Sequence, residues 1–237
     1  MTATPVVIVG HGSRDPRSSA TMRRLADRVD RRWPGPVRAA FLDFDAPSVP
    51  EALADLPEAI VVPALLTRAY HRRIDLPELL ATVDSVTRVT SVLGPESADE
   101  PADPLLLQAL TSQLPAAFDG LVLIAAGTSD ASARSTVESV ARSLGSTLNV
   151  PCAVGYASAS GPTAAEAVSC VRALGARRVA AASYFLAPGR LYDAAVDSAR
   201  SGGVLGVAKP LGAATELVDL ILARISAPAP LGVALSR

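Results

Sequence analysis

VVIVGHGSRDPRSSATMRRLADRV, residues 6–29, is the stretch that decides the fold. It opens with a continuous apolar run, passes through a glycine-containing turn and ends in apolar residues at helical spacing, which is the strand–loop–helix start of an α/β unit. The pattern returns as LVLIAAGTSDASARSTVESVARSL at residues 121–144, displaced by 115 residues from Val6 to Leu121. The same displacement pairs Gly12 with Gly127, Asp15 with Asp130, Pro36 with Pro151, Pro47 with Pro162, Glu51 with Glu166 and Pro95 with Pro210. This constant register indicates a tandem duplication in which both halves share one fold.

Each half alternates expected strands with expected helices. In the first half the strands are expected at about residues 5–10, 37–43, 59–63 and 89–93, and the helices at about residues 19–32, from 77 onward and from 105. Ser48-x-x-Glu51 is a capping box that opens a further short helix, and Thr163-x-x-Glu166 repeats it in the second half. The alternation predicts a parallel, doubly wound sheet in each half.

The division of the chain follows from the duplication. Residues 94–104 are polar and rich in proline, but the first half still needs the helix after them to cover its sheet. The linker is therefore expected near residues 115–119. We predict an α/β protein of two tandem flavodoxin-like domains, residues 1–116 and residues 117–237, each a parallel sheet flanked by helices.

The composition suits such sheets and excludes several classes of protein. Apolar residues make up 49% of the chain and aromatic residues only 4%, as expected for buried aliphatic strands. A net charge of −1 argues against a nucleic acid or an anionic membrane as partner. The opening MTATPVVIVGHGS lacks the cationic start of a signal peptide, and no apolar run approaches the ~18 residues of a membrane span, so we expect a cytoplasmic protein. Cys152 and Cys170 form no C-x-x-C motif and are expected to be small core residues.

The two histidines of the chain occupy related places. His11 follows directly on the first expected strand, and His71 lies in the loop after the third. In a flavodoxin-like sheet these strands are neighbours, and the crevice at the carboxyl ends of the strands is the usual binding site. Neighbouring strands lie ~4.8 Å apart, so both imidazoles could reach one ion. Asp43 ends the second strand at the same edge, and two imidazoles with a carboxylate suit Fe²⁺, Co²⁺ or Ni²⁺.

The alternative is a structural role for each histidine, since a single histidine after a strand more often hydrogen-bonds within its loop. Two histidines at one edge favour a functional site, because loops at this edge often carry such sites. In the second half Ala126 corresponds to His11, and Arg190 corresponds approximately to His71. The second repeat thus keeps the scaffold but lacks the imidazoles. A histidine with a purely structural role has less reason to differ between the two repeats. We predict that His11 and His71 bind a metal ion.

Three segments of the first half and two of the second carry a family resemblance. They are VGHGSRDPRSS at residues 9–19, FLDFDAPSVPEAL at 41–53, VVPALLTRAYHRRIDLP at 61–77, AAGTSD at 125–130 and SYFLAPGRLYD at 183–193. The first three resemble the sirohydrochlorin chelatases, the class II chelatases of the CbiX and SirB type. The last two are similar to the degenerate C-terminal domain of the long, two-domain members. The resemblance implies a lyase that inserts a divalent metal into sirohydrochlorin, with Fe²⁺, giving siroheme, as the favoured metal.

The resemblance also implies roles for individual residues. It makes His11 and His71 the pair that handles the metal and takes up pyrrole protons, assisted by Asp43, which stands where the family usually carries a glutamate. Because sirohydrochlorin carries many carboxylates, cationic side chains and backbone N–H groups near the histidines are expected to bind it. The candidates are Ser13, Arg14, Arg17, Arg72 and Arg190. For each arginine the alternative is a solvated loop charge.

Other functions stay open at this level. A non-catalytic carrier of metal or tetrapyrrole would need the same crevice but no proton acceptor, so the presence of imidazole and carboxylate together favours the enzyme. Cobalt insertion for cobalamin biosynthesis is the rival to iron insertion, since these ligand types do not separate the two metals. No cofactor is expected beyond the metal substrate. Single-domain relatives must pair to build the cleft that this chain can make from its two halves. The resemblance therefore implies a monomer.

Overall fold

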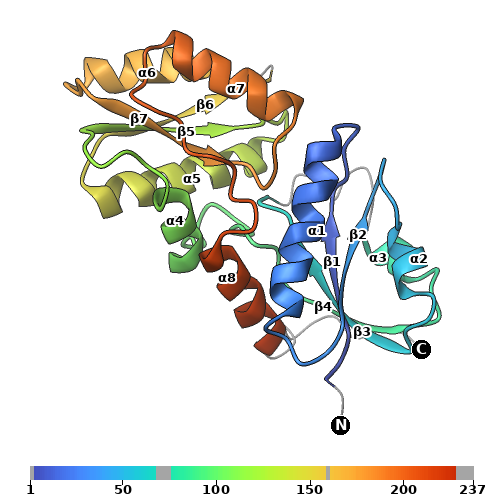
Figure 1. Ribbon diagram of the computed structural model, residues 1–237. Coiled ribbons are helices and arrows are strands. Elements are labelled where there is room, and N and C mark those ends of the chain that lie inside the picture. Colours follow the sequence, from blue (N-terminus) through green and yellow to red (C-terminus); the bar gives the residue numbers. More distant parts are fainter. Residues whose placement is uncertain (1–2, 68–75, 159–160, 228–237) are drawn as a thin grey trace. The chain divides into compact units, whose positions relative to one another are not determined.

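The chain forms two compact units, each a parallel sheet with helices on both faces (Figure 1). The computed structural model describes residues 3–67, 76–158 and 161–227. Unit 1 combines Met1–Leu93 with Ala213–Arg237, and unit 2 is the continuous segment Gly94–Gly212. The predicted α/β architecture of two repeated parallel sheets is confirmed. No helix within the described ranges combines the length and the apolar character that a bilayer crossing needs.

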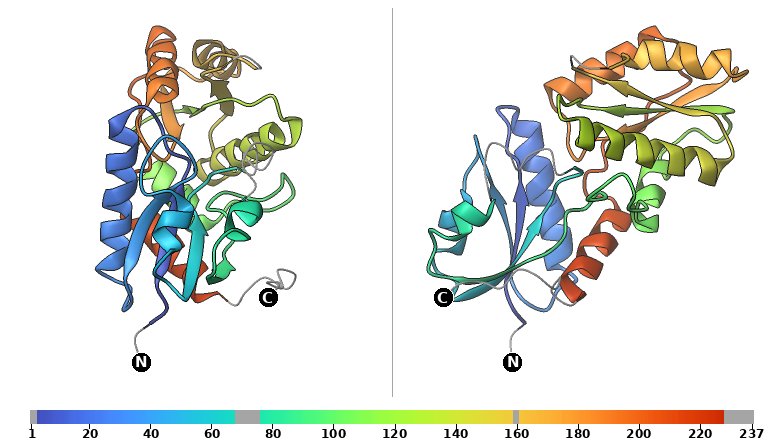
Figure 2. Two further views of the ribbon diagram at one scale, coloured as in Figure 1. Left: turned by 90° about the vertical axis from the view of Figure 1, so that its right-hand side faces the viewer. Right: turned by 180° about the vertical axis from the view of Figure 1, so that it is seen from behind.

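Unit 1 is built on a parallel sheet with the strand order β2-β1-β3-β4 in its described part. Its elements are β1 (Val6–Gly10), α1 (Pro16–Asp30), β2 (Val37–Phe41), α2 (Val49–Leu53), β3 (Glu58–Pro63), α3 (Leu76–Leu80), β4 (Val86–Val89) and α8 (Thr215–Ser226). Every residue of β1 is buried, as its continuous apolar run predicts for a central parallel strand. Helices α1 and α8 cover one face of the sheet, and α2 and α3 cover the other (Figure 2).

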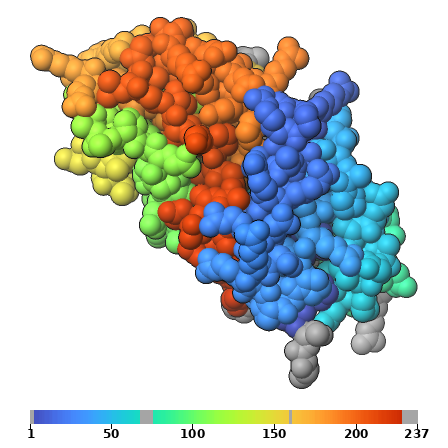
Figure 3. All heavy atoms as spheres, viewed as in Figure 1, coloured from blue at the N-terminus to red at the C-terminus, as the bar shows by residue number. Residues whose placement is uncertain are grey.

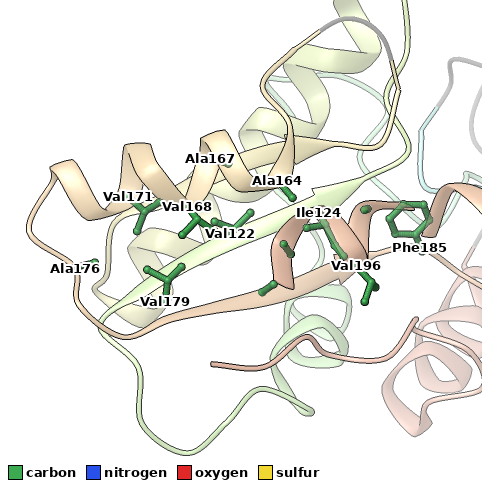
Figure 4. Packing of buried hydrophobic residues seen from close by; sticks show 13 residues of the cluster. Val122, Ile124, Ala164, Ala167, Val168, Val171, Ala176, Val179, Phe185 and Val196 are labelled. Atoms are coloured by element: carbon green, nitrogen blue, oxygen red, sulfur yellow. The ribbon is translucent and has the colours of Figure 1, made fainter. Parts of the chain in front are cut away.

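Unit 2 repeats this plan with the strand order β6-β5-β7 among its described residues. Its elements are α4 (Pro104–Thr111), β5 (Gly120–Ala125), α5 (Ala131–Leu148), β6 (Cys152–Tyr156), α6 (Ala164–Ala173), β7 (Val179–Tyr184) and α7 (Arg190–Ser201). Val122 and Ile124 of β5 pack against α6 and α7 on one face, together with Val168 and Val196 of those helices (Figure 4). Beside β7, where unit 1 has β4, a single bridge joins Ala181 and Val207.

The helices begin where the sequence places capping side chains. Asp15 caps α1 by accepting the Arg17 N–H, and Pro16 follows it at the first helical position. The two predicted capping boxes are both present, at Ser48 with Glu51 and at Thr163 with Glu166. Removing such a cap costs about 1 kcal/mol of stability, so these local signals fix the helix starts in both repeats.

The turn after the central strand is the same in both units. Gly12 has φ +88° and Gly127 has φ +90°, a conformation that residues with a side chain rarely adopt. A Cβ atom at Gly12 would lie 1.6 Å from the Asp43 carbonyl oxygen, and one at Gly127 would lie 2.7 Å from that of Ser158. Glycine therefore lets the loop after the central strand touch the loop after the neighbouring strand in each repeat.

Helix α8 belongs to the second repeat of the sequence, but it packs in unit 1 against α1 and β3. The Arg28 guanidinium of α1 donates to the Ala213 carbonyl and, from Nη2, to the Thr215 hydroxyl at 3.1 Å. Arg32, one turn further on, forms an ion pair with Asp219. The space-filling view shows α8, in red, lying against α1, in blue (Figure 3). The side chains that α8 buries are Leu217, Val218, Leu220, Ile221 and Ile225.

Helix α4 makes the opposite exchange and packs in unit 2 against α5 and β7. The compact units divide the chain between Leu93 and Gly94 and again between Gly212 and Ala213, whereas the predicted boundary between residues 116 and 117 separates the two sequence repeats. The duplication fixes the order of the elements, but a closing helix that follows a long connection can cover either sheet. The expected domain boundaries describe the sequence repeats, and the packing follows a different division.

Fragments of the chain test this division. We expect residues 94–212 to fold alone, and residues 117–237 to fail, because the second fragment lacks α4 and exposes the five apolar side chains of α8. Unit 2 loses the buried Leu106 and Leu110 of α4, each worth roughly 1.5–3 kcal/mol, which is a large part of the ~5–15 kcal/mol that stabilises an ordinary domain. Thermal unfolding followed by circular dichroism, with amide dispersion in NMR spectra, compares the two fragments. A cooperative transition in 117–237 alone would favour the sequence boundary instead.

A substitution tests the turn. Gly12→Ala should lower the melting temperature by about 5 °C or more, because the left-handed conformation alone costs ~1–3 kcal/mol and the Asp43 carbonyl must also move. Gly206→Ala is the matched control, since no atom lies within 4 Å of its added Cβ. Differential scanning calorimetry of both variants gives the comparison. Equal melting temperatures for Gly12→Ala and the parent would contradict this interpretation of the turn.

Candidate functional site

The carboxyl ends of β1 and β2 meet at one edge of the unit 1 sheet. Gly10 pairs with Phe41 in the last register of the two strands, and β3 lies on the other side of β1. His11 is the first residue after β1, and the Asp43 N–H donates to its carbonyl oxygen with an N–O distance of 2.9 Å. The fold thus brings His11 and Asp43 to the same edge. His71 and Arg72, in the segment between β3 and α3, lie outside the described residues.

The electrostatic state of His11 follows from its burial. Partial burial lowers the pKa of the His11 imidazole below its ordinary value, because the charged form loses hydration. The Asp43 charge and a backbone hydrogen bond raise the pKa and offset part of this effect. Asp43 itself is exposed, so water screens its charge. The neutral imidazole is therefore favoured near pH 7, and it is the form that binds a metal ion or accepts a proton.

Two carboxylates order the loop after β2, and that of Asp45 also joins it to the loop after β1. Asp43 Oδ1 accepts the Phe44 N–H at 2.8 Å, and Asp45 Oδ2 accepts the Ser13 N–H at 2.9 Å. The Ser13 hydroxyl in turn accepts the Asp15 N–H at 3.1 Å. The Ser13 N–H, one of the groups expected to bind an anion, thus already binds a carboxylate of the protein itself. The Ser13 hydroxyl, which accepts this one hydrogen bond, can still donate its O–H to a ligand.

An exposed aromatic residue beside His11 has no counterpart in the sequence prediction. The Phe44 ring meets the His11 imidazole edge-on, with 6.4 Å between ring centroids and 68° between their planes. The Arg14 guanidinium carbon lies 5.1 Å from the centroid of the same ring. Arg14 is itself exposed, so its charge stands at the edge of the site where the sequence predicts substrate contact. In the sequence, this cluster is marked by a phenylalanine between two aspartates directly after the second expected strand.

The other predicted substrate contacts differ in their surroundings. Arg17 Nη2 lies 2.6 Å from Asp15 Oδ2, and Arg17 Nε donates to both oxygens of that carboxylate. The pair fixes the start of α1 and balances the Arg17 charge locally, which makes Arg17 a weaker candidate for substrate than Arg14. Arg190 is the exposed first residue of α7 in unit 2, where no side chain caps the helix start.

Unit 2 repeats the backbone of this edge without the imidazole and the carboxylate at the places of His11 and Asp43. The Asp130 N–H donates to the Thr128 hydroxyl at 3.1 Å, as the Asp15 N–H does to Ser13. Ala126 stands at the place of His11, and the displacement of 115 residues puts Ser158 at the place of Asp43. The Ser158 hydroxyl donates to the Ala126 carbonyl oxygen at 2.8 Å. A serine–backbone hydrogen bond thus replaces the imidazole and carboxylate of unit 1.

The donor set of the site is small in the described part of the chain. Within residues 3–67, 76–158 and 161–227, no three His, Cys, Asp or Glu side chains gather in a group that could hold a metal ion. His11 and Asp43 offer one nitrogen and one carboxylate, a mixed set that suits first-row divalent metals. Such a set leaves coordination positions open for water or another ligand.

Known proteins resemble the chain, and one family model matches each of the two repeats. The CbiX family model matches residues 5–111 and again residues 120–227. Sirohydrochlorin cobaltochelatase of Priestia megaterium is 27% identical over 201 residues, which make up 78% of this chain and 65% of the relative. The protein of the same name from Methanothermobacter thermautotrophicus is 34% identical over 80 residues, 32% of this chain and 56% of the relative. The chain thus spans less than two thirds of either relative.

Solved structures share the fold. SirB from Bacillus subtilis with Fe³⁺ superposes with a TM-score of 0.73 at 21% identity, and the match covers 94% of each chain. At this identity the match speaks for the arrangement of strands and helices alone. The family model, by contrast, covers both repeats and most of the chain. This protein therefore belongs to the CbiX family.

Proposed function

We propose that this protein is a sirohydrochlorin chelatase, which inserts a divalent metal ion into the tetrapyrrole. The observation that carries the proposal is His11, whose imidazole is kept neutral by burial at the carboxyl edge of the central strand, beside Asp43. Family membership supports the same activity, since the relatives that match are named as chelatases of sirohydrochlorin. The repeat supports it as well, because unit 2 keeps the edge and has Ala126 there.

The reaction demands groups of this kind. As the metal ion binds the four pyrrole nitrogens, two N–H protons leave and the ion gives up bound water. A neutral imidazole can hold the ion during this exchange or accept one proton near pH 7. We assign metal delivery and proton abstraction to His11 and His71, and assistance to Asp43, whose exposed carboxylate can pass a proton to water.

Substrate binding requires positive charge at the same edge. Sirohydrochlorin is a polycarboxylate, and charge-assisted hydrogen bonds from guanidinium groups recognise carboxylates well. Arg14 is a candidate arginine that shares a neighbour with His11, since both lie against the Phe44 ring. We propose that Arg14, the Ser13 hydroxyl and Arg72 bind substrate carboxylates. Arg17 contributes less because Asp15 balances its charge.

The metal is a further part of the proposal. We propose Fe²⁺ as the physiological substrate, giving siroheme. Co²⁺ is the second candidate, favoured by the name cobaltochelatase that both relatives bear. Imidazole and carboxylate ligands bind both ions, so the ligand set does not decide between them. Insertion rates with each metal, measured side by side under anaerobic conditions, test the assignment.

Substitution of the histidines tests the function. His11→Ala and His71→Ala should each lower kcat for metal insertion by about 10²-fold or more, because a group that acts in proton or metal transfer changes the chemical step. The matched variants in the second repeat, Ala126→Ser and Arg190→Lys, should leave kcat within about twofold, with at most a raised KM for Arg190→Lys. The change in absorbance of purified sirohydrochlorin on metal insertion gives the rates.

Three outcomes separate the alternatives to this assignment. Parent-like rates in both histidine variants, with normal circular dichroism, would make the histidines structural. Tight binding of sirohydrochlorin by the parent without turnover would favour a carrier. Absence of both binding and turnover in the parent would remove the proposed function altogether.

The cysteines give an independent test of the cofactor assignment. We propose that no group beyond the metal substrate is needed, so a Cys152→Ala, Cys170→Ala double variant should keep parent-like insertion rates. Burial raises the pKa of the Cys152 thiol to about 12, which leaves it protonated and a poor ligand at neutral pH. Both cysteines are free thiols, and Cys170 lies exposed on helix α6. A double variant that folds normally but loses activity would show that a thiol takes part.

A further inference from the structure

Phe44 holds a backbone conformation that its residue type disfavours. Its φ is +63°, in the left-handed region where a residue with a bulky side chain is uncommon. Such conformations persist only where the surrounding structure imposes them, and they gather at functional sites. In the described chain the other non-glycine residue with positive φ is Asn149, which ends helix α5 in a role that suits asparagine.

The loop imposes this conformation through contacts on both sides of Phe44. Before it, the Asp43 carboxylate accepts the Phe44 N–H at 2.8 Å. The Asp43 N–H donates to the His11 carbonyl oxygen. The residue after it, Asp45, accepts the Ser13 N–H. The two aspartates therefore tie the loop to the turn after β1 and leave Phe44 at its apex.

The ring gains little burial from this position. Phe44 is 53% exposed, although aromatic side chains usually bury most of their area. Its ring lies against the His11 imidazole and the Arg14 guanidinium, and both of these groups have roles in the proposed function. A residue that is both strained and half exposed does not stabilise the fold through core packing, so the place of Phe44 beside His11 needs another explanation.

The repeat supplies a second observation. The displacement of 115 residues pairs the residues of this edge with Ala126, Ser129, Ser158, Ala159 and Ser160 in place of His11, Arg14, Asp43, Phe44 and Asp45. The imidazole, the guanidinium, the carboxylates and the aromatic ring are thus all replaced by small side chains. Phe44 differs between the repeats together with the proposed reactive groups, as expected of a residue that serves the same site.

We propose that Phe44 is a substrate-binding residue whose ring packs against the flat face of the tetrapyrrole next to His11. The proposal rests on the proposed function and names a contact within it. A conjugated macrocycle with carboxylates at its rim has an apolar face and an anionic edge. The Phe44 ring offers a complementary apolar surface, and Arg14 beside it offers the positive charge for a rim carboxylate.

Two substitutions at Phe44 separate binding from folding. Phe44→Gly removes the ring and suits the left-handed backbone, so it should raise the dissociation constant for sirohydrochlorin about tenfold while the melting temperature stays equal or rises. Phe44→Tyr keeps a flat ring and should bind within about twofold of the parent. Leu205→Ala is the matched control, because Leu205 is 52% exposed in unit 2 and should leave binding unchanged.

Absorbance titration of metal-free sirohydrochlorin measures binding, and calorimetry measures stability in the same preparations. Parent-like affinity in Phe44→Gly would overturn the proposal. So would a fall in melting temperature for Phe44→Gly with equal loss of affinity in Phe44→Tyr, since the ring would then be structural. A parent that binds sirohydrochlorin but inserts no metal would contradict the proposed function and leave the Phe44 contact measurable. A parent that fails to bind it would contradict both.

Discussion

The carbonyl oxygen of Asp43 occupies the space in which a side chain at position 12 would begin, 1.6 Å from where a Cβ atom would stand. Because Gly12 has no side chain, the loops after β1 and β2 come into contact and join through the Asp43 N–H and the His11 carbonyl. This contact sets where His11 leaves the strand and where the Phe44 turn is made. At this edge, partial burial lowers the pKa of the His11 imidazole.

Much of the fold could be predicted because its signals are local. A continuous apolar run marks a buried parallel strand, and Ser48 with Glu51 marks a helix start, whatever the rest of the chain does. The expected strand at about residues 89–93 shows the limit of this reasoning, since β4 ends at Val89. Val92 and Leu93 are buried in the connection that follows, so their apolar character reports burial and not strand pairing.

Two features depend on distant contacts and left no local signal. The placement of α8 depends on side chains such as Arg32 and Asp219, which lie far apart in the sequence and form an ion pair only in the folded unit. The Phe44 conformation is held by the hydrogen bonds of its neighbours to the turn after β1, from the Asp43 N–H to the His11 carbonyl and from the Ser13 N–H to the Asp45 carboxylate. Propensity would assign a phenylalanine to a strand, so the tertiary contacts override the local preference at this position.

The duplication separates what the fold needs from what the chemistry needs. Both repeats keep the left-handed glycine, the aspartate that caps the following helix and the capping box, because any sheet of this kind must turn and begin its helices there. Ser158 in unit 2 shows that the edge closes equally well with a hydroxyl bonded to the Ala126 carbonyl. An imidazole and a carboxylate at this edge are therefore additions to a scaffold that is complete without them. A partly buried imidazole loses hydration, and unit 2 closes the same edge with Ala126, so the presence of His11 in unit 1 accords with the metal-binding role that we propose for it.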